Sequence, residues 1–165
     1  MENIILRTAQ KHDSEKISVI YGYHVSNGLA SWEIDPPTPA IICERMVRLN
    51  TKDYPYIVAM LDNELVGYAY AGSYRERPGY RYVVENSVYV DHNYPRRGIG
   101  RQLLSRLVID CTNLGYRHML AVIETAIISV PFNPQLAFKA NCFLIRNTNL
   151  IIFIFMSGFP YSTHT

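Results

Sequence analysis

A glycine- and arginine-rich junction is the part of this 165-residue chain whose residue types best suit binding chemistry. Its sequence is Pro95-Arg96-Arg97-Gly98-Ile99-Gly100-Arg101, between an expected strand and an expected helix. Glycines allow a tight turn with exposed backbone N–H groups, and the N-terminus of the following helix adds positive potential. The junction therefore predicts a pyrophosphate site. The alternative is an ordinary glycine turn with solvated arginines.

Two common nucleotide-binding patterns do not fit this junction. A dinucleotide fingerprint needs a third glycine and an early strand–helix–strand unit, and the sequence has neither. A Walker loop needs Gly-Lys followed by Ser or Thr, which is also missing. The three cysteines and five histidines have no metal-ligand spacing, so no metal site is predicted.

Hydrophobic periodicity indicates the elements that position the junction. The run Tyr80–Val90 predicts a strand whose side chains alternate between two faces. One face carries Val84, Asn86, Val88 and Val90, and the other carries Val83, Glu85, Ser87 and Tyr89. After the junction, apolar residues at helical spacing predict a helix from Gly98 to Leu114, which Gly115 ends.

The remaining segments complete an α+β pattern. Two earlier helices are expected, one with its N-cap at Asp13 or Ser14 and one over Pro39–Asn50. Further strands are expected over Ile4–Thr8, Tyr56–Leu61, Leu65–Ala71 and His118–Glu124. This order predicts an α+β fold with a mixed sheet whose late strand–helix–strand unit is parallel.

Five separated segments occur in an order that is typical of one enzyme family. They are Ala30–Glu33, Gly67–Ala69, Gly79–Arg81, Val84–Val90 and, eight residues later, Gly98–Arg101. Together they resemble the motifs of phosphinothricin-type N-acetyltransferases in the GNAT superfamily. The resemblance extends from about Ile4 to Glu124, roughly three-quarters of the chain.

The resemblance implies a three-layer GNAT-like fold with a splayed central sheet and acetyl-CoA as cosubstrate. The pantetheine arm is expected to pair with the backbone of Val88, Tyr89 and Val90. The pyrophosphate is expected over the amides of Arg96, Arg97, Gly98, Ile99, Gly100 and Arg101. Pro95 stands where the family has Gln or Arg. Because proline has no N–H, one phosphate contact is expected to be lost, with Arg96 as a candidate substitute.

The same resemblance suggests an acceptor site. Glu85 matches the carboxylate that serves as the general base of the family, which takes a proton from the acceptor's ammonium group through water. The alternative is an exposed or salt-bridged glutamate. The acceptor's acidic groups are expected at Arg75, Gly79, Tyr80 and Arg81, since a guanidinium binds a carboxylate bidentately. Trp32 either walls the acceptor pocket or belongs to the core.

Composition changes sharply after Glu124. All 14 acidic residues lie at or before this position, although residues 125–165 include two of the 16 Lys and Arg residues. Ile127 stands where the family has asparagine, and Pro131 and Pro134 interrupt the expected helix. We therefore expect residues 1–124 to form the acetyl-CoA-binding domain and residues 125–165 to be an atypical tail.

That tail is expected to replace the last helix and strands of the family, as a frameshifted or degraded gene end would. The sheet edge after His118–Glu124 should then be poorly protected and prone to association. The uncharged, β-prone run Ile151–Phe155 adds to this hazard. Low solubility and weak activity are the expected consequences.

Sequence and resemblance together predict acetyl-CoA-dependent N-acetylation of a small amino-acid-like amine such as phosphinothricin, methionine sulfoximine or methionine sulfone. The alternative is an impaired or inactive coenzyme-A-binding remnant. A formal net charge of +2 argues against a nucleic-acid partner. No targeting signal or membrane span is recognised, so a cytoplasmic protein is expected. The family implies a homodimer.

Overall fold

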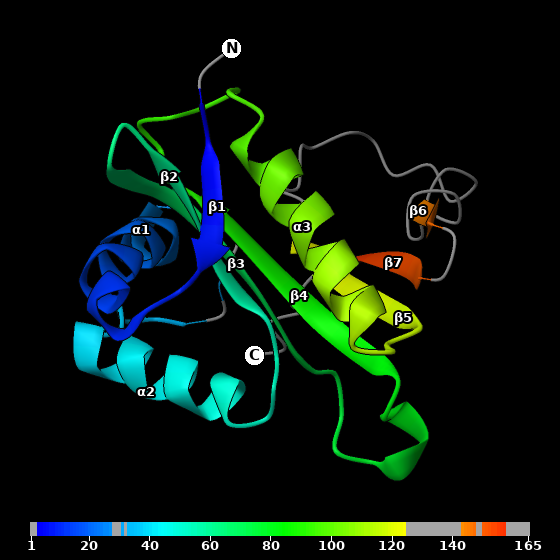
Figure 1. The fold of residues 1–165 in the computed structure, drawn as a ribbon. Helices are drawn as coiled ribbons and strands as arrows, with labels where there is room; N and C mark the ends of the chain where they lie inside the picture. The colour runs from blue at the N-terminus through cyan, green and yellow to red at the C-terminus, as the bar shows by residue number, and fades with distance from the viewer. Residues whose placement is uncertain (1–2, 28–30, 32, 125–142, 148–149, 158–165) are drawn as a thin grey trace, which may run out of the picture.

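The computed structural model describes residues 3–27, 31, 33–124, 143–147 and 150–157 (Figure 1). The elements are β1 (Ile5–Thr8), η1 (Lys11–Asp13), α1 (Ser14–Asn27), α2 (Pro39–Asn50), β2 (Tyr56–Leu61), β3 (Glu64–Ser73), η2 (Pro78–Tyr80), β4 (Val83–Val90), α3 (Ile99–Asn113), β5 (His118–Glu124), β6 (Phe143–Asn147) and β7 (Leu150–Ser157). The predicted bounds of α2, β2 and β5 are confirmed.

A seven-stranded sheet runs through the described part of the chain in the order β1-β2-β3-β4-β5-β7-β6. β1 to β4 are antiparallel neighbours, β5 runs parallel to both β4 and β7, and β6 is antiparallel to β7. α1 and α2 cover one face of the sheet and α3 covers the other (Figure 1). The predicted three-layer α+β fold is confirmed, including its parallel β4–α3–β5 unit.

Turn chemistry explains two of the boundaries. Asp62 and Asn63 have positive φ angles of 48° and 65°, as the tight turn between β2 and β3 requires. β4 begins at Val83 and not at the predicted Tyr80, because Pro78–Tyr80 forms a 3-10 turn. Proline at the first position of that turn has a fixed φ and no N–H to pair in a ladder.

The outer edge of β5 is paired, so the predicted open edge after His118–Glu124 is wrong. β7 runs parallel to β5 over its whole length, from His118 opposite Ile151 to Glu124 opposite Ser157. The run Ile151–Phe155, which has high β-propensity and no charge, lies within that strand. The same composition that suggested a hazard therefore supplies a strand partner. The predicted interruption of a helix at Pro131 and Pro134 lies outside the described residues.

Two hydrophobic clusters hold the layers together. The cluster between the sheet and α3 includes Val66, Val84, Ile99, Leu103, Leu107 and Cys111. The cluster under α1 and α2 includes Ile17, Ile20, Ile42, Met46, Val58 and Tyr68. Partly buried residues of β4 divide between them, with Val88 and Val90 packed on the α3 side and Tyr89 on the α1–α2 side. The predicted alternation of β4 is confirmed.

Gly67 is the point where β3, β4 and α3 approach most closely. A Cβ added there would lie 3.0 Å from the Tyr89 carbonyl oxygen, 3.1 Å from Ile99 Cγ2 and 3.2 Å from Leu103 Cδ1. The first of these contacts is with backbone inside the β-ladder, which cannot easily move. The absence of a side chain at Gly67 therefore lets α3 pack directly on the sheet.

We expect Gly67→Ala to lower the free energy of unfolding by about 1–3 kcal/mol, because the added methyl group overpacks this crossing. Gly79→Ala is the matched control, since a Cβ at Gly79 meets nothing within 4 Å. Urea unfolding of both variants measures the difference. Equal stabilities would show that α3 does not depend on the close approach at Gly67.

A nearly buried ion pair fixes the start of α1 to the edge strand β1. Asp13 is 4% exposed, and the Arg7 guanidinium donates to both of its carboxylate oxygens at 2.7 Å. The Gln10 amide also donates to Asp13 at 2.7 Å. Burial alone would raise the pKa of Asp13, but these hydrogen bonds outweigh it, and the pKa lies below its usual value.

Because the pKa of Asp13 is lowered in the folded state, its contribution to stability is present above the unfolded value of about 3.9 and is lost as pH falls below it. We expect Asp13→Asn to cost about 2 kcal/mol at pH 7 and much less near pH 2. Asp110→Asn, which breaks the more exposed Arg106–Asp110 pair of α3, should cost under about 0.5 kcal/mol. Denaturant unfolding at several pH values measures both variants. A loss of unfolding free energy in Asp13→Asn that did not depend on pH would contradict this account.

Candidate functional site

The sheet opens between β4 and β5, at the centre of the molecule. Their parallel pairing extends from Val83 opposite His118 to Asn86 opposite Ala121 and then stops. β4 nevertheless continues to Val90 and remains paired with β3, while β5 continues to Glu124 and remains paired with β7. The two strands therefore part after Asn86, and the splay that the family resemblance implied is present.

The last residues of β4 present main-chain groups to this opening. The Asp91 amide donates to the Val66 carbonyl at 2.9 Å, one residue beyond the Gly67–Val90 pair. Antiparallel ladders alternate, so the N–H and C=O groups of Val88 and Val90 point away from β3, whereas those of Tyr89 point toward it. Of the three residues predicted to pair with a pantetheine arm, Val88 and Val90 therefore offer backbone groups in the opening.

His24 of α1 reaches the same edge. Its Nε2 lies 2.8 Å from the Val90 carbonyl oxygen, and its ring lies 5.5 Å from that of Tyr89. Next to it, the rings of Tyr23 and His92 are stacked with their centroids 3.7 Å apart. The sequence analysis found no role for these histidines, since nothing in their spacing shows that the end of α1 lies beside the end of β4.

The predicted phosphate junction forms an open nest at the start of α3. Arg96 and Gly98 both have positive φ, 59° and 75°, with Gly98 as the N-cap of the helix. The Gln102 amide donates to the Gly98 carbonyl at 3.1 Å, so helix geometry leaves the N–H groups of Ile99, Gly100 and Arg101 without intrahelical acceptors. Such turns with free amides bind anions.

Positive side chains surround this nest, and open space lies beside its glycine. Arg96, Arg97 and Arg101 are exposed, and the Arg97 guanidinium lies 5.1 Å from the centre of the Tyr94 ring. A Cβ on Gly98 would meet nothing within 4 Å. The junction thus has the free amides, the charge and the space that a pyrophosphate needs.

A buried aspartate anchors the loop between β4 and this nest. Asp91 is 4% exposed, accepts from the Asn93 amide at 3.0 Å and lies 3.1 Å from Lys16 Nζ. Burial alone would raise the pKa of Asp91. The hydrogen bonds from Asn93 and Lys16 outweigh this effect, so the pKa lies below its usual value and the group stays ionised. The Tyr94 hydroxyl then donates to Glu64 at 2.6 Å. The sequence analysis missed this anchor, because its partners come from α1 and β3.

Glu85 lies on the opposite face from α3, just before the strands part. It stands opposite Gly72 on β3 and Leu120 on β5, one residue before the last β4–β5 pair. Its side chain is half-buried, and burial raises the pKa of its carboxyl above the usual value. A carboxylate with a raised pKa is a better proton acceptor, so the position and environment suit a general base.

The residues predicted to hold the acceptor lie in and after the β3–β4 connection. The Arg75 guanidinium lies 5.1 Å from the centre of the Tyr74 ring and 5.9 Å from that of Tyr80. Arg81 instead lies over Tyr82, at 4.5 Å, and Gly79 is exposed. The structure brings Arg75 and Tyr80 together and directs Arg81 elsewhere. Trp32 lies outside the described residues.

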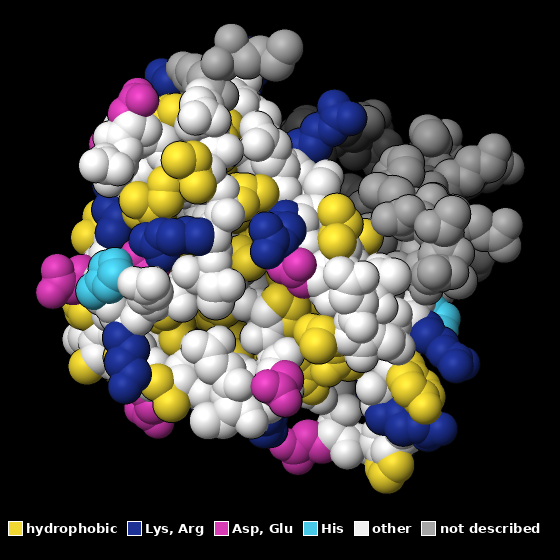
Figure 2. All heavy atoms as spheres, in the orientation of Figure 1, with side chains coloured by type: hydrophobic (Ala, Val, Ile, Leu, Met, Phe, Trp, Pro, Cys, Tyr) yellow, Lys and Arg dark blue, Asp and Glu magenta, His cyan; other side chains and the backbone are white. Residues whose placement is uncertain are grey.

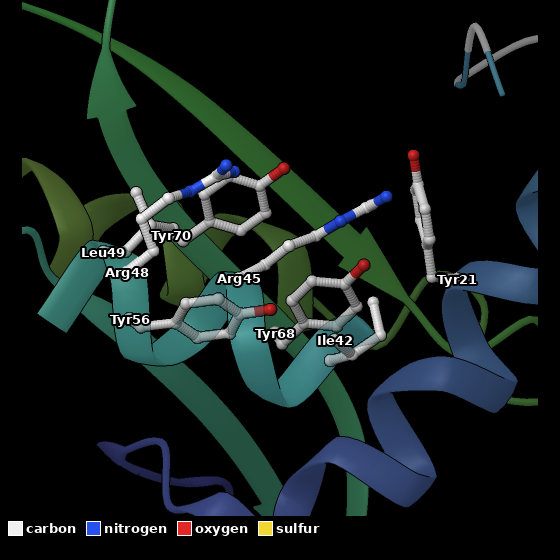
Figure 3. A pocket seen from close by; sticks show the side chains of 8 residues that line it. All are labelled: Tyr21, Ile42, Arg45, Arg48, Leu49, Tyr56, Tyr68 and Tyr70. Atoms are coloured by element: carbon white, nitrogen blue, oxygen red, sulfur yellow. The ribbon is translucent and has the colours of Figure 1, made fainter. Parts of the chain in front are cut away.

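A pocket that the sequence analysis did not predict lies under α2, on the same face of the sheet as Glu85 (Figure 3). It is lined by Tyr21, Ile42, Arg45, Arg48, Leu49, Tyr56, Tyr68 and Tyr70. Alternation places Tyr68 and Tyr70 of β3 on one face, and an antiparallel ladder puts Glu85, Ser87 and Tyr89 beside them. The tyrosines at alternate positions of β3 were the sequence signal from which this pocket could have been predicted.

An ion pair closes one side of this pocket. The Arg45 guanidinium donates to both carboxylate oxygens of Glu33, at 2.7 and 3.2 Å, and the Tyr21 hydroxyl donates to the same carboxylate at 2.9 Å. The bond from Arg45 lowers the pKa of Glu33, so the pair is ionised at neutral pH. It joins the segment between α1 and α2 to the middle of α2.

Two tyrosine hydroxyls in the pocket have no hydrogen-bond partner among the described residues. Tyr56 is 3% exposed and Tyr68 is 1% exposed, and Figure 3 shows both hydroxyl oxygens directed into the pocket. Burial raises the pKa of both phenols well above the usual value, so both remain protonated donors. A buried hydroxyl without a partner costs about 1–3 kcal/mol. Among the described residues, no acceptor atom satisfies these two hydroxyl donors.

Neither a metal centre nor a membrane span is found within the described ranges. These residues contain no group of three or more His, Cys, Asp or Glu side chains that could hold a metal ion. No helix among them is long and apolar enough to cross a bilayer. On the face drawn in Figure 2, Lys and Arg side chains are interspersed with Asp and Glu. That face carries no continuous basic patch of the kind nucleic-acid binding requires.

Known proteins resemble this chain in sequence and in fold. Residues 19–138 match the Acetyltransferase (GNAT) family. Phosphinothricin N-acetyltransferase of Alcaligenes faecalis is 37% identical over 116 residues, which are 70% of this chain and 59% of that protein. An L-methionine sulfoximine/L-methionine sulfone acetyltransferase of Salmonella typhimurium is 35% identical over 73% of this chain and 70% of its own length.

A solved structure agrees with these relatives. The GNAT superfamily phosphinothricin acetyltransferase of Sinorhizobium meliloti, in complex with acetyl-CoA, has a TM-score of 0.72 and 38% identity. The match covers 87% of this chain and 76% of that one. The fold, the splayed sheet, the helix-capping nest and these sequence matches all agree, and the chain belongs to the GNAT acetyltransferase family.

Proposed function

We propose that this protein transfers the acetyl group of acetyl-CoA to the amino group of a small amino-acid-like molecule. The observation that carries the proposal is the parting of β4 and β5 after Asn86, with Glu85 on one side and the α3 nest on the other. The chain spans 59% of the length of the Alcaligenes relative, so its activity is inferred from its own site.

The residues present fit acetyl-CoA. The amide-containing arm would pair with the N–H and C=O groups of Val88 and with the N–H of Val90. It would take the place that β5 would occupy if its ladder with β4 continued. The amides of Ile99, Gly100 and Arg101 would hold the pyrophosphate. Pro95 contributes no N–H, and the adjacent Arg96 supplies charge in its place. Bound acetyl-CoA would supply an activated thioester.

Glu85 would prepare the amine for attack. An ammonium ion has no lone pair, so it must lose a proton before its nitrogen can bond to the acetyl carbonyl carbon. The bond between that carbon and the sulfur of coenzyme A would then break, and coenzyme A would leave as a thiolate that takes a proton from water. The raised pKa of Glu85 favours its acceptance of that proton, directly or through one water. Arg75 and Tyr80 lie in the connection that precedes β4, where they would contact the acceptor.

The names of the relatives support the acceptor class. Those described above are named for phosphinothricin, methionine sulfoximine and methionine sulfone, all small amino acids with a polar, tetrahedral end group. These names favour an active enzyme over a coenzyme-A-binding remnant. The homodimer expected from the family resemblance remains part of the proposal, and light scattering of the purified chain would test it.

The phosphate nest predicts that Gly98→Leu weakens acetyl-CoA binding by at least about tenfold, because the side chain would occupy the space beside the amides. Gly115→Leu is a matched control, since Gly115 also has positive φ, 87°, and open space. Both variants should lose about 1–2 kcal/mol of stability, but only Gly98→Leu should lose affinity. Calorimetric titration with acetyl-CoA that finds equal affinities would refute the nest.

Glu85→Gln should lower kcat by roughly 10²–10⁴-fold and leave acetyl-CoA affinity unchanged, because Glu85 acts on the amine. In the parent, activity should fall as pH drops through the pKa of Glu85, which burial places above the usual ~4.3. That acidic limb should be absent from the variant. Exposed Glu15 provides the control Glu15→Gln. Thiol release followed from pH 4 to 9 tests this, and an unchanged profile would remove Glu85 from the reaction.

A further inference from the structure

One guanidinium that lines the pocket under α2, that of the exposed Arg48, has no acidic partner among the described residues. Arg45 is paired with Glu33 through two hydrogen bonds, so the charges of these two side chains offset each other. Arg48, one turn further along α2, also lines the pocket, and no acidic side chain of the described residues pairs with it. Beside it lie the buried hydroxyls of Tyr56 and Tyr68, which have no hydrogen-bond partner in the described part of the chain. A guanidinium and two hydroxyl donors together suit an anionic, oxygen-rich group.

This pocket lies on the same face of the sheet as Glu85, with Tyr70 between them. Tyr70 stands opposite Ser87 on β4, and Gly72, two residues along β3, stands opposite Glu85. The Tyr70 side chain lines the pocket and is hydrogen-bonded to Ser87. Burial raises the pKa of Tyr70; Glu85 adds to this effect, and Arg45 opposes it. Both charged groups are therefore close enough to influence one hydroxyl.

We propose that the α2 pocket is the subsite for a distal acidic group of the acceptor, with Arg48 and the hydroxyls of Tyr56 and Tyr68 as its donors. The inference rests on the proposed function, because the acceptor is the molecule whose amine meets Glu85. It differs from the sequence-based assignment of the acidic group to Arg75, Tyr80 and Arg81. Arg75 and Tyr80 follow β3 at the end where Gly72 stands opposite Glu85, and Arg81 is directed onto Tyr82.

Phosphinothricin and methionine sulfone form a matched pair of probes. They share the amino acid backbone, the chain length and a tetrahedral methyl-capped end with two oxygens, but only the phosphinate is charged. We expect Arg48→Gln to raise KM for phosphinothricin by about tenfold or more and to change KM for methionine sulfone by less than about threefold. Arg106→Gln on the outer face of α3 should change neither.

Arg75→Gln separates this proposal from its rival. If Arg75→Gln abolishes discrimination between the two probes while Arg48→Gln leaves it intact, the α2 pocket is not the acidic subsite. If the parent acetylates neither probe, the proposed function fails. Calorimetric binding of phosphinothricin to the coenzyme-A-saturated parent and Arg48→Gln then decides the subsite: about tenfold weaker binding in the variant supports it, and equal or absent binding in both overturns it.

Tyr68→Phe provides a readout that a merely structural role would not give. The hydroxyl has no partner in the described structure, so its removal should raise Tm or leave it unchanged while the ring stacking is kept. Affinity for phosphinothricin should nevertheless fall several-fold, and affinity for acetyl-CoA should not change. A variant that is destabilised yet binds phosphinothricin normally would show that the hydroxyl serves the fold and not the ligand.

Discussion

The hydrogen-bond ladder between β4 and β5 ends at Asn86, and the proposed chemistry depends on that end. Backbone groups in a sheet normally pair with the next strand, and unpaired ones need another partner. β3 holds β4 in place on one side and β7 holds β5 on the other, so the opening does not loosen either strand. The groups left on Val88 and Val90 are thus pre-arranged for an amide-containing ligand. Because the two strands themselves form the opening, no separate loop is needed to build this part of the site.

Alternation along β4 separates the two halves of the proposed reaction. Val84, Val88 and Val90 face α3, whose N-terminus forms the anion nest. Glu85, Ser87 and Tyr89 face α1 and α2, where the tyrosine-lined pocket lies. In the proposed reaction, one strand would therefore bring the acetyl donor and the amine together from opposite faces. Gly67 and the Asp91 anchor fix the strand against α3 and α1, which keeps the two halves in register.

Local sequence signals were sufficient for most of the elements, including those on either side of the glycine junction. The apolar period of α3, the glycines at its ends and the alternation of β4 depend on neighbouring residues, and each of these predictions is confirmed. The α2 pocket could not be predicted in this way, because Arg48, Tyr56 and Tyr68 meet only after α2 packs on β2 and β3. The edge of β5 was misjudged for a related reason. The sequence of Ile151–Phe155 predicts an aggregation-prone run, but the run pairs with β5, a strand that lies far away in the sequence.

Amide hydrogen exchange in the presence of acetyl-CoA tests most directly whether the parted strands bind the cosubstrate. The account predicts slower exchange at Val88 and Val90, whose amides point into the opening, and at Ile99, Gly100 and Arg101 of the α3 N-terminus. The amide of Tyr89, which points toward β3, should change little, as should those of β1 and β2. Slowing at the nest and the opening together would support the account. Unchanged exchange at Val88 and Val90 under saturating acetyl-CoA would contradict it.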